Sequence, residues 1–205
     1  GYLFDFETVA IDGDIGVALS DPIDAPDFDF QLPDHLSGSD APRVAMYKSW
    51  QEPMPAGWQR WVFDQYEMQY DTLHDANIRG GDLQDYDVLI FQAQSPNSIT
   101  SGYREGQLPL EYTGGLGEQG VAEVQAFVEN GGRVIAIEAA TGFVSDLFDL
   151  EVSNATAGLS NTDFYIPGSI LRLELDGASE INEGMSSEVS SWYWRSSMAF
   201  DVDDP

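Results

Sequence analysis

The sequence predicts an α/β protein, a three-layer doubly wound sandwich with a mostly parallel sheet. A strand is predicted over Asp85–Phe91, because its continuous apolar run, Val88–Phe91, is typical of a strand buried on both faces of a parallel sheet. A helical pattern over Glu118–Glu129 stops at two glycines, and a second apolar strand, Arg133–Ile137, follows at once. Strands that alternate with helices in this way indicate a doubly wound α/β sandwich.

Residues 1–40 differ in composition from the rest of the chain and are predicted to be an acidic arm or linker. An apolar run over Tyr2–Phe6 and a possible strand over Ile15–Leu19 precede residues 21–34, which contain three prolines and five aspartates. The prolines exclude a helix there and suit an extended conformation. An arm along a sheet edge and a poorly ordered linker both remain open. The α/β domain is expected to occupy residues 41–205.

The first part of this domain shows a strand, a helix and a second strand. Arg43–Tyr47 is a short apolar strand, and residues 53–68 form the helix. Apolar residues recur in the helix at three- and four-residue spacing, so Trp58 and Trp61 are expected to pack into the core. A short polar strand is predicted near Tyr70–Leu73.

The second part contains a long loop and a sharp corner. A glycine-containing loop is predicted over Gln92–Gly117. The strand Arg133–Ile137 is expected to be buried and to turn at Glu138 toward a helix over Phe143–Phe148. Two later strands are predicted, Ser169–Leu175 with one wet face and Trp192–Phe200.

The charge balance is strongly acidic, with 36 Asp and Glu against 8 Lys and Arg and a formal net charge of −28. Such a surface repels phosphates and anionic membranes, so neither nucleic acid nor a membrane is expected as a partner. Two interpretations of the acidity stay open, namely adaptation to high salt and binding of divalent cations through carboxylate oxygens. We favour high salt because the acids are spread along the chain rather than clustered in one loop.

The chain contains no cysteine, which excludes disulfides, thiolate metal sites and thiol catalysis. It has no apolar run of about 18 residues, so the sequence predicts no transmembrane helix. It shows no signal peptide and begins with Gly1 rather than methionine. We therefore expect it to be a piece of a longer protein.

Five segments rich in aromatic residues stand out: Met46–Trp50, Gly57–Trp61, Glu111–Gly117, Phe164–Arg172 and Trp192–Arg195. Together they resemble the C-terminal region of secreted bacterial zinc carboxypeptidase-like proteins of the M14 peptidase family. The resemblance covers residues 41–200 and implies a class I glutamine amidotransferase-like fold, which is related in architecture to the flavodoxin-like sandwiches.

The catalytic residues of both enzyme families are missing from this sequence. M14 peptidases bind zinc through a His-x-x-Glu pair and a later histidine. Neither His35 nor His74 is followed by glutamate at the third position, so zinc is expected only in a preceding domain. Amidotransferases place a cysteine at a strand-to-helix elbow and a His–Glu pair later in the chain. Here Glu138 takes the elbow position and no histidine follows His74, which excludes thiol-dependent amide hydrolysis.

Glu138 is the sharpest candidate for a chemical role. A carboxylate on an elbow can act as nucleophile, base or metal ligand, and burial there would raise its pKa. The alternative is a structural acid bonded to backbone N–H groups or to an arginine, which we favour because no partner base is identifiable. No metal site is assigned. Ser95 and Asn97 follow the Val88–Phe91 strand and are expected beside Glu138 over the same sheet edge.

Four residues late in the chain are weaker candidates for ligand binding. Arg172 and Arg195 could each hold a carboxylate, such as the C-terminus of a peptide, although an ion pair with one of the many acids is the simpler interpretation. Trp192 and Trp194 share one face of a predicted strand, and they could offer a stacking surface if that strand lies at an edge.

These observations predict a non-catalytic accessory domain, with a pseudo-active site, in a zinc carboxypeptidase-like protein. It would pack against the preceding peptidase domain or help to bind a peptide substrate. Two alternatives remain: a small-molecule or metal-dependent hydrolase that uses Glu138, and a binding or oligomerisation module. The resemblance implies a secreted or periplasmic location, and no cofactor is expected in this chain itself.

Overall fold

The computed structural model describes residues 32, 36, 38–194 and 198–202. The predicted arm, with its possible strand over Ile15–Leu19, lies almost entirely outside these residues, and so do His35 and Arg195. The first regular element begins at Val44, and the expected boundary at residue 41 stays a prediction. Within the described ranges, no helix combines the length and the apolar character that a membrane span requires.

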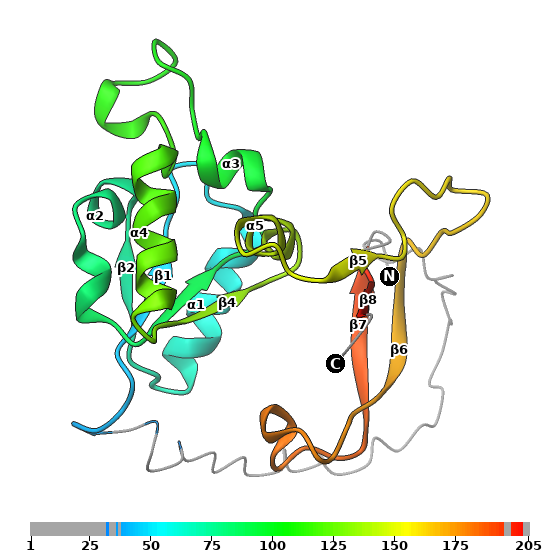
Figure 1. Cartoon of the computed structure of the whole chain (residues 1–205). Helices are drawn as coiled ribbons and strands as arrows, with labels where there is room; N and C mark the ends of the chain where they lie inside the picture. Colours follow the sequence, from blue (N-terminus) through cyan, green and yellow to red (C-terminus); the bar gives the residue numbers. More distant parts are fainter. Residues whose placement is uncertain (1–31, 33–35, 37, 195–197, 203–205) are drawn as a thin grey trace, which may run out of the picture. The chain divides into compact units, whose positions relative to one another are not determined.

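Four parallel strands form the central sheet, in the spatial order β2-β1-β3-β4 (Figure 1). Their bounds are Val44–Tyr47 for β1, Asp71–Leu73 for β2, Val88–Phe91 for β3 and Arg133–Ala136 for β4. The chain leaves β1 toward β2 and returns past β1 to β3 and β4. Right-handed crossovers therefore place α1 on one face and α2 and α4 on the other, as Figure 1 shows. The predicted three-layer α/β class is confirmed.

Five α-helices are found among the described residues: α1 (Met54–Gln65), α2 (Asp75–Arg79), α3 (Pro96–Thr100), α4 (Gly117–Glu129) and α5 (Ala140–Leu147). Three 3-10 helices accompany them: η2 (Asp82–Asp85), η3 (Leu110–Tyr112) and η4 (Glu180–Asn182). The predicted loop over Gln92–Gly117 therefore contains α3 and η3. Both are too short to show a helical period, although Ser95 before Pro96 is a favourable N-cap and first-turn pair.

Four further strands pair antiparallel, two by two. They are β5 (Val152–Asn154) with β8 (Phe200–Val202), and β6 (Gly168–Glu174) with β7 (Glu188–Trp194). The predicted strand over Ser169–Leu175 is confirmed as β6 to within one residue. The prediction of a single strand over Trp192–Phe200 is wrong. The first residues of this range form the end of β7, and its last residue is the first of β8.

The opposite face of the sheet from α2 and α4 is only partly covered. Met46, Ile90 and Ile135 are register partners in one row across that face, and their exposed fractions are 1%, 3% and 49%. The side chains on this face are thus less buried at β4, which is an edge strand. Arg133–Ile137 was predicted to be a buried strand, and this is wrong for the face that carries Ile135. The strand also ends at Ala136, one residue earlier than predicted.

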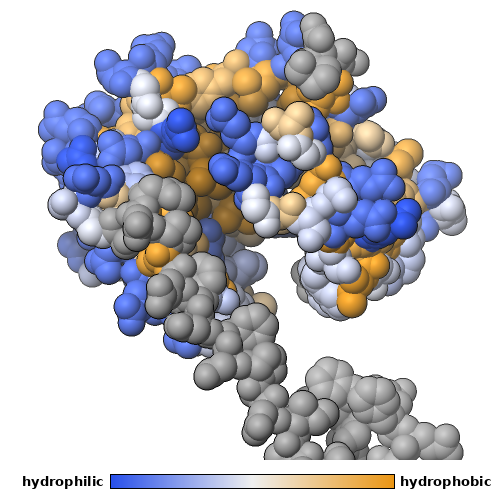
Figure 2. Space-filling model, turned by 90° about the horizontal axis from the view of Figure 1, so that it is seen from below, coloured by the Kyte–Doolittle hydropathy of each residue, from blue (hydrophilic) through white to orange (hydrophobic). Residues whose placement is uncertain are grey.

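Helix α1 turns its apolar stripe toward solvent. The exposed members are Met54, Trp58, Trp61 and Val62, which we call the α1 face. Trp58 is 65% exposed and Trp61 is 53% exposed, so the prediction that they pack into the core is wrong. Helical spacing identifies which residues share a face, but it does not say what covers that face. Figure 2 shows hydrophobic residues gathered in patches at the surface.

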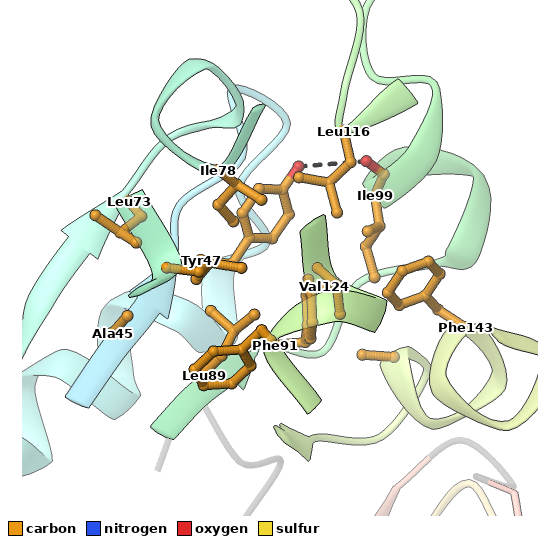
Figure 3. Packing of buried hydrophobic residues seen from close by; sticks show 13 residues of the cluster. Ala45, Tyr47, Leu73, Ile78, Leu89, Phe91, Ile99, Leu116, Val124 and Phe143 are labelled. Atoms are coloured by element: carbon orange, nitrogen blue, oxygen red, sulfur yellow. Dashed lines mark hydrogen bonds between the residues drawn. The ribbon is translucent and has the colours of Figure 1, made fainter. Parts of the chain in front are cut away.

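The core lies on the face of the sheet that α2 and α4 cover (Figure 3). Tyr47 on β1 and Leu89 and Phe91 on β3 are fully buried there. The Phe91 ring lies 5.2 Å from the ring of Phe143 on α5 and 5.3 Å from the ring of Tyr47. The other helices contribute Ile78, Ile99, Val124 and Phe127. The helix predicted over Glu118–Glu129 is thus confirmed as α4, and one of its faces packs into the core.

Candidate functional site

The carboxyl ends of the four parallel strands meet at one edge of the sheet. The strand order reverses between β1 and β3, and ligands of open α/β sheets bind outside such a switch point. The segments that leave the strands there are Lys48–Trp50 after β1, His74–Asp75 after β2, Gln92–Ser95 after β3 and Ile137–Glu138 after β4. This edge is the first place where the fold could hold a ligand.

Tyr47 and Asp75 form a buried hydrogen-bonded pair at this edge. The Tyr47 hydroxyl donates to Oδ1 of Asp75, and it also lies 3.3 Å from the carbonyl oxygen of Ile99 (Figure 3). Burial raises the pKa of Asp75, whereas the bond from Tyr47 and the charge of Arg79 act in the opposite direction. Burial and the Asp75 carboxylate also raise the pKa of the Tyr47 hydroxyl. The pair ties β1 to α2.

A second buried polar contact closes the gap between β1 and β3. Nε2 of Gln94 donates to Oγ of Ser49 at 2.8 Å, and both residues are buried. Oγ of Ser49 also accepts from the backbone N–H of Gln51 at 2.9 Å. The polar groups at the switch point are therefore engaged with each other, as buried polar groups require.

Three aromatic rings cap the β2 side of the edge. The imidazole of His74 stacks on the indole of Trp50, with ring centroids 3.9 Å apart and planes 6° apart. Tyr112 from η3 meets Trp50 edge-on at 4.7 Å. Nδ1 of His74 is buried, and among the described residues it has no hydrogen-bond partner.

Glu138 stands on the elbow between β4 and α5 in a left-handed conformation, with φ of 50°. That conformation costs a residue with a Cβ atom about 1–2 kcal/mol. Oγ1 of Thr141 donates to the Glu138 carbonyl oxygen at 2.6 Å and helps to hold the turn. Glu138 is exposed, so the burial considered for a carboxylate on this elbow is not found. Among the described residues, no hydrogen bond to its carboxylate is found.

His74 and Glu138 lie at opposite ends of the sheet. His74 follows β2 and Glu138 follows β4, which are the two outer strands. Neighbouring strands are about 4.8 Å apart, so three spacings separate the two residues by about 14 Å. This distance is far beyond hydrogen-bond reach, and His74 therefore cannot act as a base for Glu138.

Ser95 and Asn97 lie on the β4 side of the edge, as predicted. Ser95 is the N-cap of α3, and its Oγ accepts from the Ser98 N–H at 3.2 Å. Asn97 is exposed in the first turn of α3. Helix α3 packs against α5, since a Cβ on Gly142 would lie 3.5 Å from Pro96. The capping bond gives Ser95 a structural role, which needs no ligand.

The remaining predicted site residues that the structure describes belong to the β6–β7 pair. Arg172 makes exposed ion pairs with Glu174 and Glu188, at 3.6 and 3.5 Å, as the simpler interpretation expected. Trp192 and Trp194 share one exposed face of β7. Within the described ranges, no group of three or more His, Asp or Glu side chains is placed to hold a metal ion.

The sequence interpretation missed the residues that follow β1 and β2. Ser49 and Trp50 lie within three residues of the end of β1, and His74 and Asp75 follow the end of β2. The position of a residue just after a parallel strand is the sequence signal that identifies them. The stacking of Trp50 on His74 has no sequence signal, because 23 residues separate them.

Comparisons with known proteins add little to this geometry. No protein-family model matches the sequence. No curated protein matches it either. Among solved structures, the chain is similar to a "putative GMP synthase" component from Thermoplasma acidophilum, with 11% sequence identity and a TM-score of 0.45. The match covers 76% of this chain and 66% of that one. The α/β class therefore stands on the strand order and crossovers described above.

Proposed function

We propose that this chain is a non-catalytic accessory domain that packs against another folded domain of its own polypeptide through the α1 face. The observation that carries the proposal is the outward-facing apolar stripe of Met54, Trp58, Trp61 and Val62. An amphipathic helix normally turns such a stripe toward a core, and extended apolar patches mark interaction sites. Ile135 on β4 is exposed on the same side of the sheet, which a partner would also cover.

The carboxyl edge of the sheet supports a role without catalysis. The Tyr47–Asp75 and Ser49–Gln94 contacts use the buried polar groups of the switch point. Glu138 is exposed on its elbow, and three strand spacings separate it from His74. An acid–base pair for hydrolysis needs two groups within hydrogen-bond reach of the same substrate atom or of one another.

The partner that we propose is the preceding peptidase domain of a secreted or periplasmic zinc carboxypeptidase-like protein of the M14 family. The resemblance of the five aromatic-rich segments motivates this choice. Zinc and the scissile peptide would then be bound by the preceding domain. This chain would contribute a docking surface, and its amidotransferase-like elbow would be a pseudo-active site.

The proposal is tested first on the parent reading frame and then on the two domains. The frame upstream of this chain should encode a His-x-x-Glu pair and a later histidine, and their absence would overturn the choice of partner. Produced separately, the preceding domain and this chain should associate in titration calorimetry. The double variant Trp58→Asp/Trp61→Asp should weaken that association more than about tenfold, because buried tryptophans dominate interfaces.

A matched control is available on the same chain. Leu110 in η3 is an exposed apolar residue outside the α1 face, so Leu110→Asp should leave the association unchanged. Both tryptophans are mostly exposed, so the double variant should unfold at nearly the wild-type temperature. Equal binding by wild type and the double variant would refute docking through the α1 face.

A further inference from the structure

The antiparallel pair of β6 and β7 places one continuous row of side chains on one face. Four cross-strand pairs make up this row: Gly168 with Trp194, Ile170 with Trp192, Arg172 with Ser190 and Glu174 with Glu188. We call these residues the tryptophan face. The row passes from an apolar half to a charged half, and none of its members belongs to the α1 face.

The apolar half of the tryptophan face is exposed. Trp192 is 61% exposed and Ile170 is 70% exposed. The rings of Trp192 and Trp194 stack on one another, with centroids 5.8 Å apart and planes 24° from parallel. A Cβ on Gly168 would lie 2.9 Å from the indole of Trp194. Glycine at this position thus lets the indole lie against the neighbouring strand.

The charged half carries a net negative charge. Arg172 sits between Glu174 and Glu188, at 3.6 and 3.5 Å, and all three side chains are mostly exposed. One guanidinium therefore faces two carboxylates. The connection from β6 to β7 adds Asp176, Glu180 and Glu183, so the negative charge continues past the strand ends.

The exposed apolar side chains of this face indicate that it binds a partner. A two-stranded antiparallel pair is marginally stable in water, and it gains stability when its hydrophobic face is covered. Tryptophan and isoleucine at the centre of such a face offer a large apolar area for that cover. The acidic half beside it limits the kinds of molecule that can supply the cover.

Charge decides between the classes of partner. With a net charge of −28, the chain repels acidic peptides, nucleic acids and a second copy of itself. A neutral sugar would match only the aromatic half. Lysine and arginine side chains match both halves, because their aliphatic stems cover apolar surface and their cationic ends are attracted to indole faces and to carboxylates.

We propose that the tryptophan face binds an extended peptide segment rich in lysine or arginine. One cationic side chain lies across Trp192 and Trp194, with its stem against Ile170. A cationic side chain further along the segment pairs with Glu174 or Glu188. Aromatic stacking supplies the short-range contact, and the acidic surface brings the segment to it.

The test uses a fluorescently labelled synthetic peptide of four lysine–glycine repeats and the whole chain at low ionic strength. Fluorescence anisotropy should show binding, and Trp192→Ala should weaken it about tenfold through loss of the cation–π contact. Trp58→Ala removes an equally exposed tryptophan from α1, so it should leave the affinity unchanged. The same peptide with glutamate in place of lysine should not bind.

A second variant keeps the strand pair intact. Glu188→Gln changes only a charge, and it should weaken peptide binding about threefold and make the affinity less dependent on salt. Glu111→Gln removes an exposed acid from η3 and serves as its control, with unchanged affinity expected. Wild-type affinity in Glu188→Gln would overturn the proposed use of the charged half.

Three further outcomes would overturn the proposal. The first is equal loss of peptide binding in Trp58→Ala and Trp192→Ala, which would indicate attraction to the acidic surface at large. The second is binding of the neutral sugar cellohexaose without binding of the lysine peptide. The third is dimerisation of the wild type, but not of Trp192→Ala, in sedimentation at the same ionic strength.

Discussion

Tyr47→Phe removes a single hydroxyl from the buried pair at the carboxyl edge and leaves the ring in place. The hydroxyl donates to the Asp75 carboxylate, and both residues are buried. The phenylalanine ring should keep the contacts that Tyr47 makes with Phe91. The variant therefore leaves a buried carboxylate without this donor and does not open a large cavity.

The expected loss follows from the charge of the acceptor. A hydrogen bond to a charged group contributes about 1.5–3 kcal/mol, so we expect the free energy of unfolding at pH 7 to fall by about 2 kcal/mol. For a domain of this size, the midpoint of thermal unfolding should fall by about 4–8 °C. Urea unfolding gives the free energy, and thermal unfolding gives the midpoint.

The pH dependence gives an independent check. Burial raises the folded-state pKa of Asp75 above its value in the unfolded chain, so the folded state holds the proton more tightly. The contribution of Asp75 to stability is then fully present below the pKa that it has in the unfolded chain, and it is lost as the pH rises through its folded-state pKa. The bond from Tyr47 lowers that pKa, and the variant loses this effect. The stability that Tyr47→Phe loses relative to wild type should therefore be largest where Asp75 is ionised, and it should shrink as the pH falls through the folded-state pKa of Asp75.

Asp75→Asn is the matched control. It keeps a carbonyl acceptor for the Tyr47 hydroxyl and removes the titrating charge, so its stability should vary less with pH than that of wild type. The reasoning would be refuted by a Tyr47→Phe variant as stable as wild type at pH 7. It would also be refuted by a deficit that grows on acidification.

Two further predictions concern the acidic surface and the backbone. If the acidic surface is an adaptation to high salt, the midpoint of thermal unfolding should rise markedly from low to molar sodium chloride. Calcium at equal ionic strength should cause no further rise. An unchanged midpoint, or an extra rise with calcium, would contradict this. Gly132→Ala should lower the free energy of unfolding by about 1–3 kcal/mol, because a Cβ there would lie 2.4 Å from the Phe127 ring. Gly57 lies on α1 with open space around it, so Gly57→Ala should raise the free energy of unfolding by about 0.5–1 kcal/mol. Equal effects of the two glycine variants in urea unfolding would contradict the close contact between Gly132 and Phe127.

The buried elements of the α/β layer were predictable because their signals are local. The apolar run over Val88–Phe91 and the helical period of α4 were both found in the expected places. The two glycines after α4 also mark its end as expected, since Gly131 has a φ of 95°. Helices α2, α3 and η3 were not predicted, because each spans less than two turns.

The candidate site was only half predictable. The rule that ligands gather at the carboxyl ends of parallel strands led to Ser95, Asn97 and Glu138, and the fold brings these segments to one edge. The capping role of Ser95 has a local signal, because Pro96 follows it directly and favours the first turn of a helix. The exposure of Glu138 has no such signal, because it depends on which other segments pack against the elbow.

The α/β class and the absence of thiol chemistry follow from the sequence alone, because periodicity and residue type are properties of short stretches of chain. Which apolar faces are covered depends on the packing of the whole chain. Trp58 and Trp61 have the spacing of core residues and are exposed, whereas Met46 and Ile90 are buried in the row that leaves Ile135 exposed. Burial depends on what packs against a face, and in this fold one helix covers one side of the sheet while the core fills the other.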